Sequence, residues 1–183
     1  SGELVRISVI DGDRLIWVAV AQGATGGLRY DPGQEQGVVV HLASSAGGKA
    51  WLSSMSDEDA LARVSAQGLL RQAEGTGPGA PRSLTFLLEQ LAEARNCGYA
   101  TAVDSYIAGM AAMAVPVRYQ GHGVVVGCLS IAGPAVRMTP AHMGNLASRL
   151  QVAAAEIGEA ASGSHYFKAI VRNLQPDQER QSA

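Results

Sequence analysis

The sequence is poor in the residues that mark several common classes of protein. Only 2 of its 183 residues are cysteine, and Cys97 and Cys128 stand far apart and outside any C-x-x-C spacing. We therefore expect neither a disulfide framework nor a zinc site, and a reducing, cytoplasmic location is the simplest interpretation. Aromatic residues make up 5% of the chain and charged residues 16%, whereas apolar residues reach 47%. The core must therefore consist mainly of closely packed aliphatic and small side chains.

Charge of one sign and long apolar runs are also lacking. The net charge is −2, without a basic run or an acidic tail. Nucleic-acid-binding domains usually carry a clustered basic surface, so we do not expect these residues to contact DNA directly. No stretch reaches the ~18 continuous apolar residues of a membrane span, and no signal peptide opens the chain. Because strand-like residues follow Ser1-Gly2 at once, we expect the chain to be a fragment of a longer protein.

Alternating apolar residues predict strands near both ends of the chain. Apolar and β-branched residues fill 4–10 and 15–20 around Asp11-Gly12-Asp13, which predicts a hairpin. Residues 37–42 are expected to form a third strand, and residues 109–119 and 124–132 two more.

Helix-start signals lie between and after these strands. Helices are expected over about 46–55, after Ser56, after Ser83 and after Thr139-Pro140. Asn96-Cys97-Gly98 is expected to end the helix that begins after Ser83. The order β-β-β-α-α-α-β-β-α predicts an α+β fold, with a mainly antiparallel sheet of about five to six strands and helices packed on it. We assign this domain to residues 1–161 and a polar tail to residues 162–183.

No catalytic constellation is evident. Gly48-Lys49 suggests a phosphate-binding loop, but that motif requires Gly at position 43 and Ser or Thr at position 50. Ala43 and Ala50 occupy those positions. The 4 histidines are scattered, no Ser lies in G-x-S-x-G, and no cluster has metal-ligand spacing. We therefore expect no enzyme activity, no metal and no cofactor.

Small residues over 44–48, ahead of the first predicted helix, are the main positive feature. The first backbone N–H groups of a helix lack partners and favour negative charge, so they could hold a carboxylate. Alternatively, the small residues only let the helix pack closely on the sheet, and the sequence leaves both interpretations open. Met110 and Met113 suit an adaptable pocket wall, although a core position is favoured for both.

Four stretches, taken in order, resemble the C-terminal effector-binding domain of the IclR-type bacterial transcription regulators. Residues 44–52 are similar to the family's H-A-T-A-x-G-K-A-x-L, and residues 87–100 to its L-x-x-E-L-x-x-V-R-x-x-G-Y-A. Residues 109–117 are similar to G-V-x-C-I-A-A-P-V, and residues 124–134 to an apolar strand ending in S-I-S-G-P. The resemblance covers about residues 4–161.

This resemblance implies a GAF/profilin-like fold with a small-molecule effector pocket between sheet and helices. It also implies a homo-oligomer, either a dimer or a tetramer, and DNA binding only through an N-terminal winged helix-turn-helix that this chain lacks. We therefore expect the sensor half of a regulator. A stand-alone GAF-like signalling module without DNA binding is the alternative, and an enzyme on the same fold is disfavoured because nucleophile, base and metal cluster are missing.

The resemblance also places the pocket. Family members that bind small organic acids use an Asp, a Cys and two Ser, which fall here on Ala102, Ala112, Ser130 and Ala132. Three of these four polar side chains are lost and Ser130 is kept, which predicts a bulkier, more hydrophobic class of effector that includes aromatic acids. Any carboxylate would then bind the backbone near the start of the helix. The remaining expected ligand-binding residues are Ala46, Gly47, Gly48, Met110, Leu28 and Tyr30.

Overall fold

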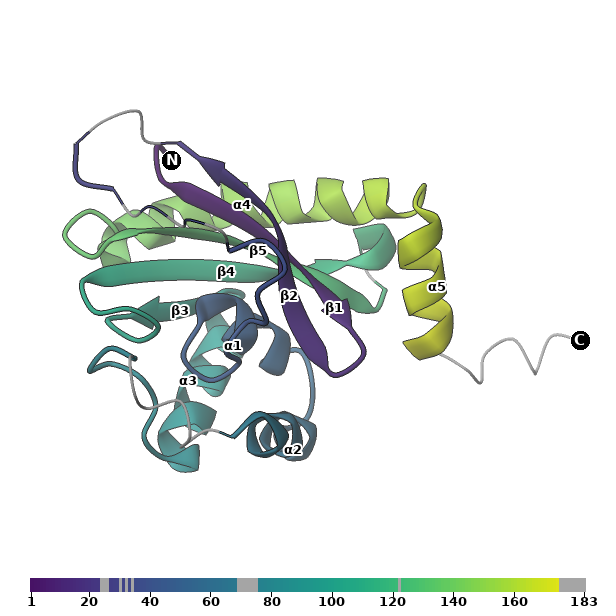
Figure 1. Ribbon diagram of the computed structural model, residues 1–183, viewed down its shortest axis with the longest axis horizontal. Coiled ribbons are helices and arrows are strands. Elements are labelled where there is room, and N and C mark those ends of the chain that lie inside the picture. Colours follow the sequence, from purple (N-terminus) through teal and green to yellow (C-terminus); the bar gives the residue numbers. More distant parts are fainter. Residues whose placement is uncertain are drawn as a thin grey trace, which may run out of the picture.

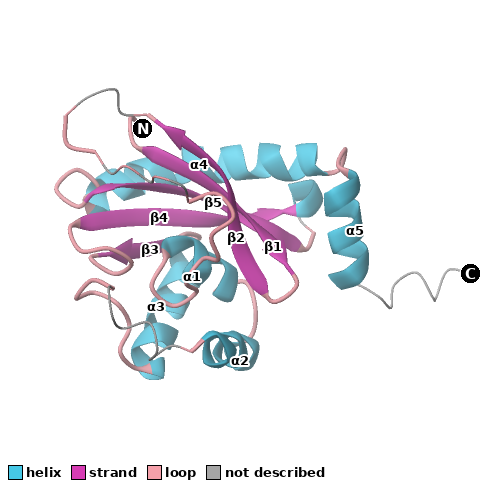
Figure 2. Ribbon diagram, viewed as in Figure 1, coloured by secondary structure: helices cyan, strands magenta, loops and turns pink. Residues whose placement is uncertain are grey.

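A computed structural model describes residues 1–23, 27–29, 31, 33, 35–68, 76–121 and 123–174. An antiparallel sheet of five strands, in the order β2-β1-β5-β4-β3, lies between two groups of helices (Figures 1 and 2). The strands are β1 (Leu4–Asp11), β2 (Arg14–Gln22), β3 (Ala100–Val103), β4 (Met110–Arg118) and β5 (Val125–Pro134). The helices are α1 (Ala46–Leu52), α2 (Asp57–Gln67), α3 (Leu84–Cys97), α4 (Pro140–Ala161) and α5 (His165–Leu174). The predicted α+β class and strand number are confirmed.

Strand β5 is the centre of the sheet. It pairs with β1 on one side and β4 on the other, and all of its residues are buried. Its Gly127 lies against β1 so closely that a side chain there would meet the carbonyl of Ser8. The covered faces of β5 therefore separate two apolar cores.

Each core has its own helices. One forms between the sheet and α1–α3, around Leu15, Leu42, Leu52 and Leu87. The other forms between the sheet and α4, and Phe167, Ile170 and Val171 of α5 pack against it. The predicted boundary at residue 161 coincides with the end of α4, but the segment after it includes a helix that contacts the core.

The predicted helix starts are confirmed in detail. The side chains of Ser56, Ser83 and Thr139 each accept a hydrogen bond from the backbone N–H three residues later. Ser45 caps α1 in the same way, by accepting from Gly48. Gly98, in the left-handed conformation with φ of 76°, ends α3 as expected.

The predicted third strand over 37–42 is wrong. Within the described residues of this segment, only Val39 forms a β-bridge, with Ile16, although Gly37 and Val40 donate hydrogen bonds to the carbonyls of Trp17 and Leu15. The chain turns into α1 immediately afterwards, so a longer ladder cannot form beside β2. Conversely, β3 was not predicted, because four small and β-branched residues directly after α3 are too few to show a strand period. The observed order is therefore β-β-α-α-α-β-β-β-α-α.

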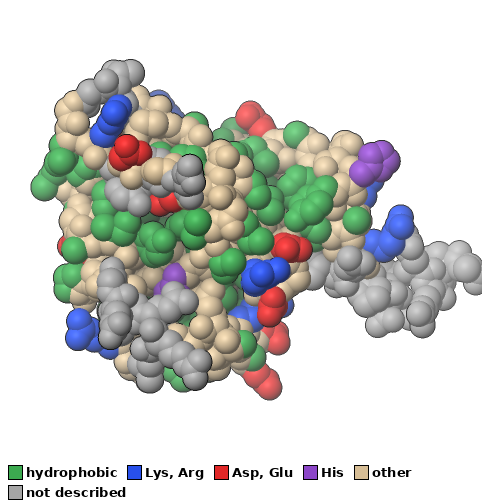
Figure 3. Space-filling view, in the orientation of Figure 1, with side chains coloured by type: hydrophobic (Ala, Val, Ile, Leu, Met, Phe, Trp, Pro, Cys, Tyr) green, Lys and Arg blue, Asp and Glu red, His purple; other side chains and the backbone are tan. Residues whose placement is uncertain are grey.

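The surface combines apolar and scattered charged side chains. On the face drawn in Figure 3, apolar side chains gather over the sheet and toward α5, and the basic side chains stand apart from one another. Val18 on β2, Val152 on α4 and Tyr166 on α5 are among the exposed apolar residues. This face therefore shows no basic patch.

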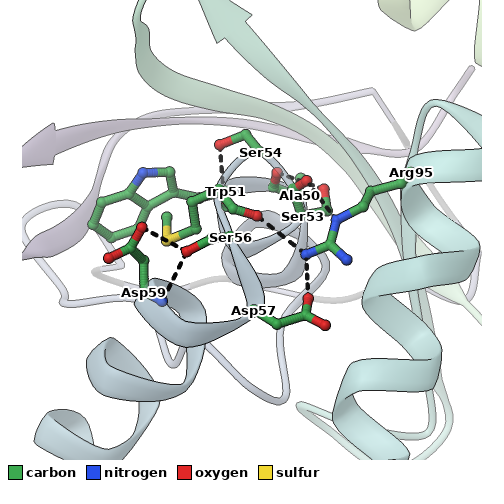
Figure 4. A network of polar contacts seen from close by, with 9 residues as sticks. Ala50, Trp51, Ser53, Ser54, Ser56, Asp57, Asp59 and Arg95 are labelled. Atoms are coloured by element: carbon green, nitrogen blue, oxygen red, sulfur yellow. Dashed lines mark hydrogen bonds and ion pairs between the residues drawn. The ribbon is translucent and has the colours of Figure 1, made fainter.

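Helix α1 is held in place by Arg95 of α3. Its guanidinium donates to the carbonyls of Ser53 and Met55, each at 3.1 Å, and lies 2.7 Å from the carboxylate of Asp57. Figure 4 shows Arg95 reaching between the end of α1 and the start of α2. This contact fixes the short helix whose other end faces the sheet.

Candidate functional site

A pocket opens between the first turn of α1, the β1–β2 hairpin and β4. Its empty space, including the open mouth, is about 450 Å³, but only about 30 Å³ can hold the centre of a water-sized group. It is lined by Arg6, Trp17, Ser45, Ala46, Gly47, Ala102, Tyr106, Ile107, Met110, Ala111, Ala112 and Ser130. In this form the pocket is therefore largely filled by the protein's own side chains, with room for one or two water molecules.

Most of the expected ligand-binding residues come together in this pocket. They are Ala46, Gly47, Ala102, Met110, Ala112 and Ser130, which lie on α1, β3, β4 and β5. Most lining side chains on these elements are small. The hollow exists because alanine and glycine leave space that larger side chains would fill. Ser130 also donates to the carbonyl of Arg6 at 3.4 Å.

The other expected residues lie elsewhere. Gly48 is outside the lining, its N–H donates to Ser45, and a side chain on it would meet the backbone of Leu42. Its lack of a side chain therefore serves the close approach of α1 to the preceding turn. Ala132 is buried in β5, and Leu28 is exposed. Tyr30 lies outside the described residues.

Four important lining residues were missed from the sequence: Arg6, Trp17, Tyr106 and Ile107. Arg6 has the strongest signal, because it shares the inward-facing phase of β1 with Leu4, Ser8 and Ile10, which are all buried. A charged residue at an apolar phase of a strand is uncommon, and it points to a buried partner or a ligand.

Among the described residues of the lining, Arg6 is the only charged one, and it is tightly held. Its Nε lies 2.6 Å from Oε2 of Glu35 and its Nη2 lies 3.0 Å from Oε1, so the pair is bidentate. The side chains of Arg6 and Glu35 are only 6% and 9% exposed. The guanidinium carbon also lies 4.9 Å from the centre of the Trp17 ring. The pocket therefore has a cationic group set against an aromatic wall.

Tyr106 completes that wall. Its ring meets Trp17 edge to face, with centroids 5.5 Å apart and planes at 80°. Burial raises the pKa of Tyr106, the negative charge of Glu35 raises it further, and Arg6 opposes the shift. The phenol is therefore neutral at physiological pH and can exchange a hydrogen bond with a ligand.

The titratable residues nearby do not form a nucleophile and base pair. His41 accepts from the backbone N–H of Ser44 at 3.2 Å, and burial lowers its pKa, so it is a neutral part of the turn before α1. Burial raises the pKa of Cys128, which keeps that thiol protonated. Within the described residues, no three or more His, Cys, Asp or Glu side chains gather as they would around a metal ion.

Lys49 follows the pocket residues of α1 but points elsewhere. It is almost completely buried, and its Nζ donates to the carbonyl of Thr101 at 3.0 Å. Burial lowers its pKa to about 8, and the negative charge of Glu93 partly offsets that shift. Lys49 therefore ties α1 to β3 rather than facing a ligand.

A second hollow lies at the β3 edge, between α3 and the start of α4. It is lined by Gln90, Glu93, Ala94, Cys97, Tyr99, Thr101, Val103, Pro140 and Met143. Several of these side chains are exposed, and none of the described lining residues is a buried charged group. The α1 pocket, which combines a buried cation with aromatic and small residues, is the better candidate site.

Comparison with known proteins agrees with this fold. Residues 1–159 match the family model described as the C-terminal domain of the bacterial transcriptional regulator IclR. The chain belongs to the IclR family. Among the curated IclR-type relatives is the HTH-type transcriptional repressor AllR of Klebsiella pneumoniae, which is 30% identical over 140 residues. That alignment covers 76% of this chain and 48% of AllR, so the chain spans about half the length of the curated relatives it matches.

Solved structures of IclR-type domains have the same fold. The inducer-binding domain of PobR from Acinetobacter, a double mutant in complex with 3-hydroxybenzoic acid, has a TM-score of 0.71 at 22% identity and covers 87% of this chain and 90% of that one. The C-terminal domain of Escherichia coli KdgR has a TM-score of 0.69 at 22% identity, with coverages of 86% and 87%. Among the helices that the structure describes, none is both long and apolar enough to cross a bilayer.

Proposed function

We propose that this chain is the effector-sensing domain of a transcription regulator whose DNA-binding part lies outside it. The observation that carries the proposal is the α1 pocket, where small residues at the family's effector positions surround a buried arginine. The relatives named as HTH-type repressors support it, because they are about twice as long as the matched region. We further propose that the protein is a cytoplasmic homo-oligomer without catalytic activity. Exposed apolar residues such as Val152 are suited to a contact between subunits.

The proposed effector is a small aromatic carboxylate. Trp17, Ile107 and Met110 provide an apolar wall, and the alanines at 102 and 112 leave it flat. Once the side chains that fill the pocket move aside, a ring can pack there, and one acidic group can bind Arg6 in a bidentate manner. The PobR domain in complex with 3-hydroxybenzoic acid supports this class of ligand.

Arg6 is the more suitable receptor for the acid than the backbone of α1. Helix α1 has only 7 residues, so its dipole is weak, and the side chain of Ser45 already accepts a hydrogen bond from the N–H of Gly48. The amides of Ala46 and Gly47 can still contribute a secondary contact, because they belong to the first turn of the helix.

A binding panel tests the proposal. We expect benzoate and 3-hydroxybenzoate to bind and raise the melting temperature, and glyoxylate and pyruvate to have little effect, because they cannot fill the aromatic wall. Ala112→Val should weaken binding of benzoate by roughly tenfold or more by filling the pocket, while Ala19→Val, on an exposed part of β2, should not. Isothermal calorimetry measures both effects. Stabilisation only by the two small keto acids would contradict the aromatic ligand class.

The stand-alone signalling module is the second candidate, since its pocket would look the same. The reading frame upstream of this chain distinguishes the two. A helix-turn-helix pattern there supports the regulator, and its absence supports the separate module.

A further inference from the structure

The partner of Arg6 comes from a distant part of the chain. Glu35 stands 29 residues later, on the connection between β2 and α1, and its carboxylate meets the guanidinium with two short contacts. Arg6 lines the pocket, whereas Glu35 does not. One carboxylate of the protein itself thus already occupies one bidentate edge of the pocket cation, formed by Nε and Nη2.

The charge balance of the Arg6–Glu35 pair determines how an acid can bind in the pocket. The buried pair is neutral as a unit, so an acid entering beside it would place an uncompensated negative charge in a water-poor site. An acid that replaces Glu35 keeps the charge of Arg6 balanced and keeps a bidentate geometry. Exchange of one carboxylate for another therefore avoids most of the electrostatic cost.

The two partners differ in how easily they can move. Arg6 is in the middle of β1, between β2 and β5, with its backbone in both ladders. Glu35 is on the connection between β2 and α1, where its side chain is buried but the residues after it, Gln36 and Gly37, are exposed. The backbone of Gly37 is fixed by a hydrogen bond to the carbonyl of Trp17 at 2.8 Å. A change of Glu35 rotamers can thus bring its carboxylate into water while the main chain stays in place.

We infer that Glu35 is a built-in substitute for the effector's carboxylate, and that an aromatic acid binds by displacing Glu35 from Arg6. The inference rests on the proposed function, because it uses the same pocket and the same class of ligand. Displacement also adds space, since Arg6 can then turn toward the ligand, which suits a pocket with little free volume. The release of Glu35 gives ligand binding a defined structural consequence, which is a new side-chain position on the β2–α1 connection.

Variants of Glu35 test the inference by calorimetry with benzoate and its neutral analogue benzamide. We expect Glu35→Ala to bind benzoate about tenfold tighter than the unmodified chain, because the competing carboxylate is gone, and to bind benzamide unchanged. Glu35→Gln, which keeps the size of the side chain, should tighten benzoate binding in the same direction even if the alanine variant folds poorly.

Glu3→Gln is the matched control. Glu3 is also buried and forms a bidentate pair, with Arg137 at 2.6 and 2.9 Å, but neither residue lines the pocket. We expect this variant to bind benzoate like the unmodified chain. If benzoate binds and neither Glu35 variant tightens it, the inference is wrong and the proposed function stands. If no aromatic acid or amide binds any of these proteins, the proposed function fails as well.

Discussion

At the scale of single residues, the burial of charged side chains is the main feature that was not predicted from the sequence. Arg6 and Lys49 are both buried, and the charge of each is compensated in a different way. Arg6 has a carboxylate partner at ion-pair distance, whereas Lys49 has a backbone carbonyl and only the more distant influence of Glu93. An unpaired buried ammonium loses its proton readily, so Lys49 should make stability depend on pH.

The pH dependence has a definite sign. Unfolded lysine keeps its proton up to about pH 10.5, whereas folded Lys49 releases it near pH 8. Between these values the unfolded state binds more protons, so the free energy of unfolding should rise with pH, by about 3 kcal/mol in total. Lys49→Met has no such group, and its stability should lack this rise. Urea denaturation from pH 7 to 10.5 measures the difference between the two proteins, and parallel curves would contradict the prediction.

Cysteine accessibility gives a second prediction at this scale. Cys97 is exposed at the end of α3, and Cys128 is buried in β5, where burial also raises its pKa. The native protein should therefore react with one equivalent of a thiol reagent, and the second thiol should react only after unfolding. Absorbance titration with and without denaturant checks this, with Cys97→Ser as the control that should show no native reaction.

At the scale of elements, α1 depends on two adjacent glycines for different reasons. A side chain at Gly48 would meet the backbone of Leu42, whereas one at Gly47 would make an ordinary contact, 3.7 Å from Leu15. Gly48→Ala should therefore destabilise the fold by about 1–3 kcal/mol. Gly47→Ala should be neutral or stabilising by up to about 1 kcal/mol, because alanine favours helix. Urea denaturation measures both, and equal effects of the two substitutions would refute this account of α1.

The helix ends, the segment before α1 and the pocket show what the sequence could and could not predict. Local signals located the helix ends at Ser56, Ser83, Thr139 and Gly98, because capping is decided by a few neighbouring residues. The segment over 37–42 has strand composition, but its pairing depends on where the chain must turn to begin α1. Ala46 and Gly47 of the pocket were found as small residues ahead of a predicted helix, and Ala102, Ala112 and Ser130 by resemblance to a family. Trp17, Tyr106 and Glu35 were not, because tertiary contacts bring them together from distant segments.

At the scale of the whole molecule, net charge bears on the proposed division between a sensing domain and a separate DNA-binding domain. The chain has a net charge of −2, and the face in Figure 3 shows basic side chains scattered among acidic ones. A net negative charge gives little electrostatic attraction to a row of phosphates, which is the main source of non-specific DNA affinity.

We therefore expect this chain alone to show no binding to duplex DNA at physiological salt. A typical non-specific binder has a Kd of about 10⁻⁴–10⁻⁶ M under these conditions. Fluorescence anisotropy with a labelled duplex, at chain concentrations into that range, makes the measurement. The full-length regulator on its own operator is the positive control, and benzoate added to each tests whether the sensor acts through the DNA-binding part. Salt-sensitive binding by the isolated chain would mean that a basic surface forms on assembly, and it would contradict the division between a sensing domain and a separate DNA-binding domain.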